Sequence, residues 1–225
     1  MTITVKLGGV HGADQDPKIV RGDIVMYDVS SYYPMFYLFI GRAPDGLLDS
    51  FLDLYADSIA TRLTVKGHDK AQADSLKLQL NAVYGKGNSK FSVLYDPIIA
   101  RAITINGQLM LTMLAEQLED AGCTLLDVNT DGVLVKTPNK DRSNQIVEKW
   151  CSLIEYPDKY DSVIRFTADP VFYEIYAGFA VSNYALYNGK EWSVRKGALL
   201  GNPSLMSPSI ISEANGTDLR FYGCP

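Results

Sequence analysis

Three short segments of the chain carry residue types that suit chemistry on phosphates. They are residues 28–34 (DVSSYYP), 77–85 (KLQLNAVYG) and 129–132 (NTDG). The first and third segments each place a carboxylate at the end of an apolar run typical of a strand. The second places a lysine, an asparagine and a tyrosine on one face of a helix. Together they predict two metal ligands and a triphosphate clamp, which are the requirements of nucleotidyl transfer.

The two carboxylates are Asp28, at the end of a predicted strand over 19–28, and Asp131, in the bend of a predicted hairpin over 123–135. Neighbouring strands lie about 5 Å apart, so the two side chains would share one site. Hard oxygen ligands of this kind suit Mg²⁺, and we expect two ions, with Mn²⁺ as a substitute. The alternative is that Asp131 only serves a turn, because Asn, Asp and Gly are turn residues.

The helical segment offers Lys77, Asn81 and Tyr84 at i, i+4 and i+7. A lysine, an amide and an aromatic ring on one face would bind the phosphate, sugar and base of one nucleotide. More positive charge for a triphosphate would come from the facing helix and turn: Arg62, Lys66 and Lys70. The alternative for this segment is an exposed lysine beside a core tyrosine.

Charge supports a nucleic-acid partner locally but not globally. The chain has a formal net charge of −5, which argues mildly against phosphate binding. From residue 59 to 105, however, basic residues outnumber acidic ones, which predicts a local contact surface. A solvated helical face would show the same excess.

The hydrophobic pattern predicts the elements that position these residues. We expect strands over 19–28, 163–175, 179–187 and 192–195, the hairpin over 123–135, and helices over 35–40, 47–63, 70–84, 98–121 and 141–154. For the helix over 70–84, Asp69 is the expected N-cap and Gly85 marks the expected end. Asp96-Pro97 is expected to open the long helix over 98–121. The fold class is α+β: an antiparallel sheet with helices on one face and a projecting helical hairpin.

Two stripes have simpler interpretations. Acidic residues recur every four positions at Asp45, Asp49, Asp53 and Asp57, which predicts a solvated helix face rather than a metal site. An apolar stripe on the long helix is predicted to face the core: Ile99, Ile103, Leu109, Met110, Met113, Leu114 and Leu118.

Length and composition limit the number of domains and the cellular environment that we expect for the protein. With 225 residues and 47% hydrophobic content, the chain forms one large domain or two small ones. No uninterrupted apolar run approaches a membrane span, so we expect no membrane partner. Three widely spaced cysteines, Cys123, Cys151 and Cys224, predict reduced thiols and a cytoplasmic location.

Taken in order, the three segments resemble the signatures of family B DNA polymerases, particularly the compact phage and protein-primed branch. Residues 28–34 are similar to its Asp-x-x-Ser-Leu-Tyr-Pro motif, 77–85 to Lys-x-x-x-Asn-x-x-Tyr-Gly, and 129–132 to Asp-Thr-Asp-Ser. The resemblance covers roughly residues 7–201. It implies a polymerase palm over 1–43 and 92–201, fingers over 44–91, and a tail or vestigial thumb over 202–225.

The resemblance also implies roles. Asp28, Asp131 and the Val29 carbonyl would hold the catalytic metals, and Tyr33 would exclude a 2′-hydroxyl. The residues implied to bind the incoming deoxynucleotide are Ser31, Tyr32, Tyr33, Arg62, Lys66, Lys70, Lys77, Asn81 and Tyr84. Those implied to contact primer-template DNA are Gly8, Gly9, Gly85, Asn129, Thr130, Arg195 and Lys196.

The chain departs from the family pattern in two ways. Asn129 replaces the first aspartate of the third motif, and Asp127, two residues earlier, would partly restore its charge. We also expect no exonuclease domain before Leu7 and an absent or vestigial thumb after Gly201, which predicts low processivity and no proofreading.

Two other functions fit the same residues. The chain would be a conditional subunit of a split replication polymerase if it needs separate thumb, exonuclease or priming subunits. A reverse transcriptase or an RNA-synthesising palm is the other alternative, although Tyr33 as a sugar gate argues against the use of ribonucleotides.

Overall fold

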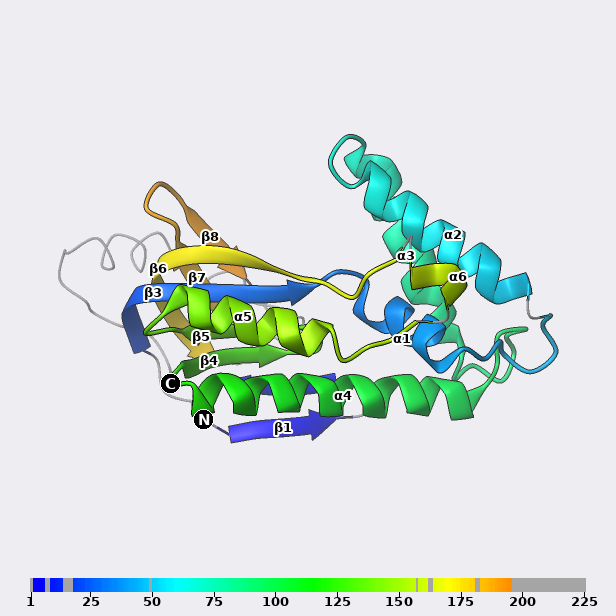
Figure 1. Cartoon of the computed structure of the whole chain (residues 1–225), viewed down its shortest axis with the longest axis horizontal. Helices are drawn as coiled ribbons and strands as arrows, with labels where there is room; N and C mark the ends of the chain where they lie inside the picture. Colours follow the sequence, from blue (N-terminus) through cyan, green and yellow to red (C-terminus); the bar gives the residue numbers. More distant parts are fainter. Residues whose placement is uncertain are drawn as a thin grey trace, which may run out of the picture.

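A single antiparallel sheet organises the chain in the computed structural model, which describes residues 2–6, 9–13, 18–48, 50–156, 158–161, 164–180 and 183–195. Within these ranges the sheet has eight strands in the order β1-β2-β4-β5-β3-β6-β7-β8 (Figure 1). The strands are Thr2–Lys6, Gly9–Ala13, Lys18–Val29, Thr124–Asn129, Gly132–Lys136, Ala168–Ala180, Asn183–Tyr187 and Trp192–Arg195. The predicted antiparallel sheet is confirmed.

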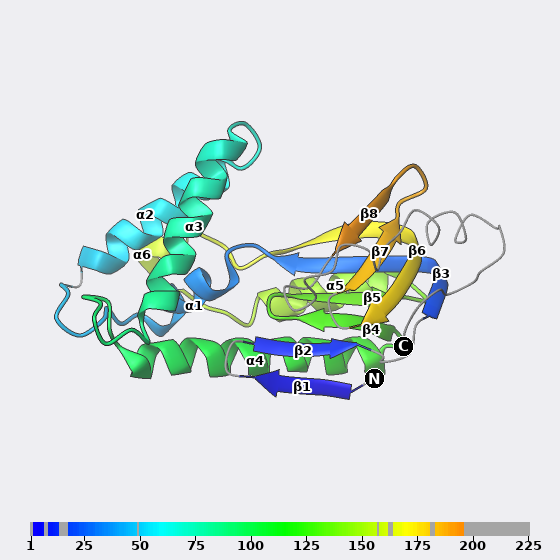
Figure 2. The same cartoon turned by 180° about the vertical axis from the view of Figure 1, so that it is seen from behind.

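Helices lie on one face of this sheet and beyond its end. They are α1 (Tyr32–Ile40), α2 (Ser50–Val65), α3 (Lys70–Lys86), α4 (Pro97–Asp120), α5 (Lys140–Cys151) and α6 (Asp158–Asp161). Figure 1 shows α4 and α5 in front of the sheet, and Figure 2 shows the same sheet in front of them. The α2–α3 hairpin projects away from the sheet, so the mixed α+β class with a helical hairpin holds.

Strand β3 is the central element because both of its faces are buried. Val25 and Tyr27 face the core beneath α4 and α5, whereas Ile24 and Met26 pack on the opposite face with Tyr184 and other residues. A run of consecutive buried residues is typical of such an interior strand. The strand's register shifts between Arg21 and Ile24, where Gly22 has a φ of 125°, so Gly22 lies in a β-bulge inside the strand.

The α2–α3 hairpin begins its second helix as predicted but ends it later. The Asp69 side chain accepts a hydrogen bond from the Gln72 N–H at 3.0 Å and caps α3. The predicted end at Gly85 was wrong, because α3 continues to Lys86 and Gly87 ends it. A Cβ on Gly87 would lie 3.1 Å from the Cβ of Ala100, so the junction with α4 selects glycine there.

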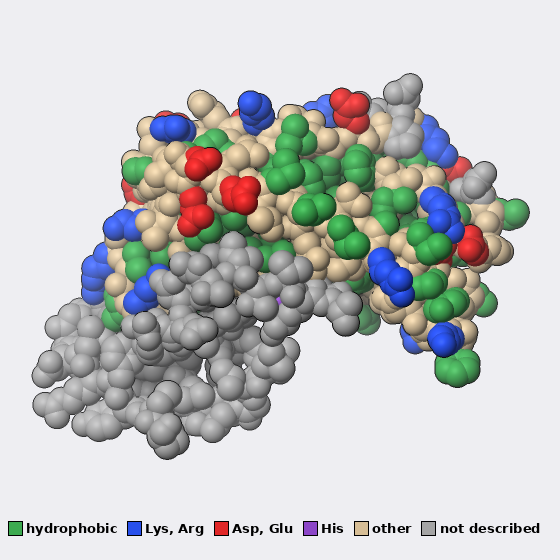
Figure 3. All heavy atoms as spheres, turned by 90° about the horizontal axis from the view of Figure 1, so that it is seen from below, with side chains coloured by type: hydrophobic (Ala, Val, Ile, Leu, Met, Phe, Trp, Pro, Cys, Tyr) green, Lys and Arg blue, Asp and Glu red, His purple; other side chains and the backbone are tan. Residues whose placement is uncertain are grey.

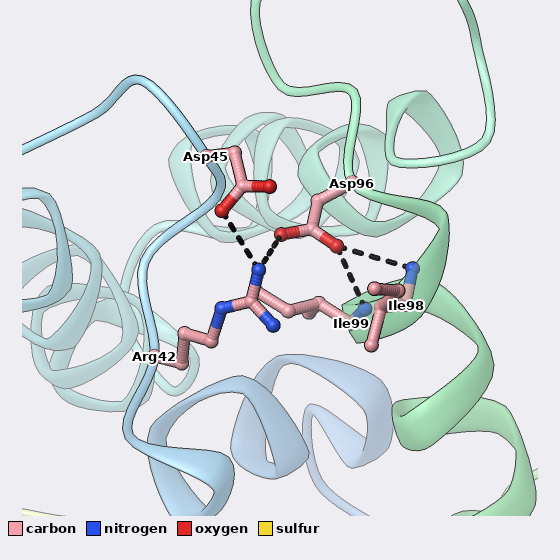
Figure 4. A network of polar contacts seen from close by, with 5 residues as sticks. All are labelled: Arg42, Asp45, Asp96, Ile98 and Ile99. Carbon is pink, nitrogen blue, oxygen red and sulfur yellow. Dashed lines mark hydrogen bonds and ion pairs between the residues drawn. The ribbon is translucent and has the colours of Figure 1, made fainter.

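The start of α4 is fixed by Asp96, which is 1% exposed (Figure 4). Its Oδ1 accepts hydrogen bonds from the Ile98 and Ile99 N–H groups at 3.1 and 3.0 Å, and its Oδ2 accepts one from Arg42 at 2.8 Å. Arg42 also bonds Asp45 at 2.8 Å. The predicted Asp96-Pro97 helix start is confirmed, and Arg42 ties it to the segment after α1.

Helix α4 buries only part of the predicted stripe. Ile99, Ile103, Leu114 and Leu118 are buried, but Leu109 is 59% and Met113 42% exposed, so their assignment to the core was wrong. The reason is that α4 carries apolar residues on two opposite sides, and the sequence pattern assigned residues from both sides to one buried stripe. Among the described helices, α4 alone is long and apolar enough to cross a membrane, with a mean hydropathy of 1.4 over 18 residues. In that window 44% of the residues are buried inside the fold. A helix that packs in the core of a protein also meets this criterion of length and hydropathy.

Candidate active site

The end of β3, the β4–β5 turn and the helical hairpin enclose a cavity of about 320 Å³. It lies between the end of the sheet and the hairpin, and it extends as far as Lys66 in the α2–α3 turn. The cavity is lined by Asp28, Val29, Ser30, Ser31, Tyr32, Tyr33, Pro34, Arg62, Lys66, Lys77, Leu80, Asn81, Tyr84, Thr130 and Asp131. Segments separated by about a hundred residues in the sequence thus meet in one site.

The two carboxylates stand at the same end of neighbouring strands. Asp28 pairs in register with Gly132, and the Val29 N–H donates to the Asp131 carbonyl at 2.9 Å. A Cβ on Gly132 would lie 2.9 Å from the Tyr27 carbonyl, so only glycine permits this approach. Asp28 is exposed and Asp131 is half-buried, which leaves oxygen atoms accessible from the cavity.

This pair fits a magnesium site that is completed by substrate. Mg²⁺ is bound in proteins by one or two carboxylates together with phosphate oxygens and water, and the two aspartates supply such hard oxygens. Among the described residues no cluster of three or more His, Cys, Asp or Glu side chains is present. The two carboxylates therefore suit an ion whose coordination is completed by a bound phosphate. They suit less well an ion that is coordinated by protein side chains alone.

The turn that carries Asp131 has an unusual backbone. Thr130 has a φ of 38°, a left-handed conformation that β-branched residues rarely adopt. Its N–H donates to the Val10 carbonyl at 2.9 Å, and a Cβ on Gly9 would lie 2.9 Å from its Oγ1. Strand β2 thus packs directly against the turn, and Gly9 provides the space.

Asn129 and Asp127 meet the two carboxylates on the other side of the sheet edge. A small recess there is lined by Asp28, Asp127, Asn129 and Asp131, together with Tyr184 and other residues. Asp127 is only 2% exposed. The structure thus places Asp127 and Asn129 in one recess with the two carboxylates, and restoration of the missing charge by Asp127 stays a prediction.

Two tyrosines of α1 line the cavity, and one of them contacts Tyr84 of the hairpin. The Tyr32 hydroxyl donates to the Gly107 carbonyl at 2.5 Å, and the Tyr33 ring lies 4.4 Å from the Tyr84 ring. Burial raises the pKa of both the Tyr32 and the Tyr33 hydroxyl, and the Asp131 carboxylate raises each further. Both hydroxyls are therefore protonated at neutral pH.

Helix α4 supports these rings through residues that the sequence analysis missed. A Cβ on Gly107 would lie 3.1 Å from the Tyr32 ring and 3.2 Å from the Tyr33 ring. The Thr104 hydroxyl donates to the Ala100 carbonyl at 2.8 Å, so the Tyr84 hydroxyl is the donor in its 2.7 Å contact with Thr104. A glycine inside an apolar helix was the available signal for Gly107.

The hairpin contributes three cations to the cavity. Arg62 is buried, its Nη1 donates to the Ser31 hydroxyl, and its Nε is buried without a hydrogen-bond partner in the part of the chain that is described. Burial lowers the pKa of the Arg62 guanidinium, and the Asp74 and Asp28 carboxylates oppose that shift. Lys66 donates to the Ser30 hydroxyl at 3.1 Å, and Lys77 is exposed at the rim.

A buried cation with an unsatisfied donor is costly unless an anion completes it. Ser31, which Arg62 contacts, also has a left-handed backbone with a φ of 56°. Such strain in a non-glycine residue is typical of functional sites. The hairpin side of the cavity is therefore built for an anion, opposite a pair of carboxylates.

Other predicted residues lie elsewhere. Lys70 does not line the cavity, and Gly85 is an exposed position of α3 at which a Cβ would meet nothing within 4 Å. Arg195 ends β8 and pairs in register with Tyr184. Gly8 and Lys196 lie outside the described residues.

The fold and the cavity together define an α+β domain in which strand-end carboxylates face a basic helical hairpin. A comparison with solved structures finds a protein with a similar fold. A family B DNA polymerase from the hyperthermophilic archaeon Pyrobaculum calidifontis matches 81% of this chain with a TM-score of 0.54 and 17% sequence identity. At that identity the match establishes similarity of fold.

Sequence comparison points in the same direction over a shorter stretch. DNA polymerase 1 of Saccharolobus solfataricus is 29% identical over 76 residues, which is 34% of this chain. No protein-family model matches the chain. The chain therefore has distant, partial similarity to family B DNA polymerases, and it spans 28% of the solved relative and 8% of the curated one.

Proposed function

We propose that this chain is the nucleotide-adding core of a DNA polymerase, which extends a primer 3′ end with deoxynucleotides on a template. The observation that carries the proposal is the single cavity in which Asp28 and Asp131 face Arg62, Lys66 and Lys77. Carboxylates for metal ions on one side and cations for a triphosphate on the other match the needs of in-line phosphoryl transfer. The palm would comprise residues 1–43 and 92–201, and the fingers 44–91.

Asp28, Asp131 and the Val29 carbonyl would hold two Mg²⁺ ions. When bound, the ions lower the pKa of the primer hydroxyl and neutralise charge on the phosphates. Arg62, with Lys66 and Lys77, binds and orients the triphosphate so that its α-phosphate faces the primer end. Fixed charges that need no rearrangement during the reaction supply most of the rate in such sites.

The remaining side chains select the nucleotide and hold the DNA. Tyr33, whose ring contacts that of Tyr84, lies under the sugar and excludes a 2′-hydroxyl, while Asn81 and Tyr84 border the new base pair. Ser31 and the backbone near Tyr32 meet the triphosphate. The residues proposed to contact primer-template DNA are Gly8, Gly9, Gly85, Asn129, Thr130, Arg195 and Lys196, and Lys70 adds charge near the hairpin tip.

Primer extension with Mg²⁺ by the Asp131→Asn variant tests the proposal. Loss of one ligand charge should lower the extension rate at least about a hundredfold, in line with the loss of one transition-state stabilising group. Asp57→Asn is the matched control, because Asp57 is an exposed α2 carboxylate outside the cavity and should retain wild-type activity. Full activity in Asp131→Asn would exclude Asp131 as a metal ligand. Gel analysis of product length measures processivity and 3′–5′ degradation in the same reaction.

One observation favours a second candidate, a conditional polymerase subunit. Asn129 supplies no charge where the third motif of the family has a carboxylate. In this case the isolated chain would extend primers only when partner subunits are added. Activity of the purified chain alone would rule this candidate out.

A further inference from the structure

Helix α4 carries a second apolar side that is open to solvent. Ile98, Ile105, Leu109 and Met113 are 64%, 53%, 59% and 42% exposed. Their spacings of seven, four and four residues place them along one line of the helix, which we call the outer ridge. The buried residues of α4, Gly107 among them, fall on the opposite side. The ridge is thus an apolar surface that the described fold leaves uncovered.

The outer ridge is flanked by charges of opposite sign at its two ends. Arg101 is exposed near the start of α4, and Glu116, Glu119 and Asp120 are exposed near its end. In Figure 3 apolar side chains form a band on this face, with acidic side chains grouped toward one end. An apolar line with a positive start and a negative end complements a copy of itself in the reverse direction.

We propose that the outer ridge is the interface of a homodimer in which two α4 helices pack antiparallel about a two-fold axis. In this arrangement Arg101 faces Glu116 of the partner subunit, and Glu116 faces Arg101 of the partner subunit. The midpoint between positions 101 and 116 falls beside Leu109, so the two Leu109 side chains meet at the axis. A two-fold interface requires this kind of self-complementary patch, and antiparallel helix dipoles favour it.

Charge distinguishes a second copy from a membrane surface. Helices that lie on membranes carry Lys and Arg beside their apolar face, whereas this ridge ends in three acidic residues. Because each copy contributes one helix, the interface is small, and dimerisation should depend on concentration. The ridge faces away from the cavity, so the dimer does not depend on the proposed polymerase activity.

Sedimentation equilibrium over a concentration series measures the dimer directly. The wild-type chain should shift from monomer to dimer as concentration rises, and Leu109→Glu should remain a monomer. Leu54→Glu is the matched control, because Leu54 is a helix residue on α2 that is 67% exposed and lies outside the ridge. It should dimerise like the wild type, and circular dichroism establishes that each variant folds.

Charge reversal identifies the partner as a second copy in this orientation. Arg101→Glu and Glu116→Arg each place like charges opposite one another and should weaken dimerisation at least about tenfold. An equimolar mixture of the two variants restores both opposite-charge contacts and should dimerise like the wild type. A mixture no stronger than its components would overturn the proposal. So would a wild-type chain that is monomeric at every concentration, whether or not it binds anionic vesicles or another protein.

Discussion

At the scale of the residue, Tyr33 is the proposed sugar gate of the site. Its ring is held between the Tyr84 ring at 4.4 Å and the α4 backbone at Gly107. Both contacts fix the ring rather than its hydroxyl. Exclusion of a ribose 2′-hydroxyl would therefore depend on the presence of the ring, and a smaller side chain would open that space.

Tyr33→Ala should increase ribonucleotide incorporation relative to deoxynucleotide incorporation by roughly 10- to 100-fold, the range of a single pocket contact. Tyr33→Phe keeps the ring and should keep the discrimination. Single-nucleotide extension with each nucleotide type measures the ratio. Free entry of ribonucleotides into the wild-type protein would show that Tyr33 is not a sugar gate.

Gly107 packs against the rings of both Tyr32 and Tyr33. Gly107→Ala would place a methyl group 3.1 Å from the Tyr32 ring, which cannot retreat because its hydroxyl is bonded to the Gly107 carbonyl itself. Overpacking of this kind costs about 1–3 kcal/mol, so the thermal midpoint and the extension rate should both fall. Gly85→Ala, also within a helix but open to solvent, should instead raise stability by about 0.5–1 kcal/mol. Equal effects of the two substitutions on unfolding would refute the packing argument.

At the scale of the element, Asp96 joins α4 to the rest of the molecule. Asp96→Ala removes the helix cap and should lower the free energy of unfolding by about 1–2 kcal/mol. Asp96→Asn keeps a capping oxygen and loses only the pairing with Arg42, which is half-exposed, so its cost should be smaller. Urea unfolding compares the two. Equal losses would assign the stability to the ion pair instead of the cap.

Local sequence signals predicted most of the elements, but not strands β1 and β2. The correct and the incorrect predictions have identifiable physical causes. Asp69 and Asp96 cap the helices that they precede, because capping involves only neighbouring backbone N–H groups. Helix α3 ends at Gly87 and not at the predicted Gly85, because Ala100, in another helix, lies against Gly87. Leu109 was assigned to the core because apolar residues on both sides of α4 look alike in a sequence.

In the candidate site, too, some residues could be predicted from local motifs and others could not. The motifs predicted Asp28, Lys77 and Asp131 as site residues because their residue types suit phosphate chemistry, and these residues line one cavity. The supporting contacts join residues that are far apart in the sequence: Gly107 lies 75 positions after Tyr32, and Thr104 lies 20 positions after Tyr84. No local sequence pattern predicts contacts over such separations.

At the scale of the whole molecule, metal should be needed for reaction and not for folding. The described residues hold no cluster of three or more metal-ligating side chains that would act as a structural site. EDTA should therefore abolish primer extension and leave the thermal midpoint unchanged, and Mg²⁺ or Mn²⁺ should restore activity. A fall of several degrees in the midpoint would reveal a structural ion and contradict this expectation.

Helix α4 touches most parts of the described fold. It packs against β2, β4, β5, α1 and α5, accepts hydrogen bonds from Tyr32 and Trp150 at its backbone carbonyls, and receives Tyr84 of α3 at Thr104. Opening α4 therefore disturbs the sheet, the hairpin and the cavity at once. Its central amide protons should be among the last in the chain to exchange with solvent, at a rate set by global unfolding. The sheet and the hairpin would then behave as one cooperative unit, with α4 as the element through which the loss of either is transmitted to the other.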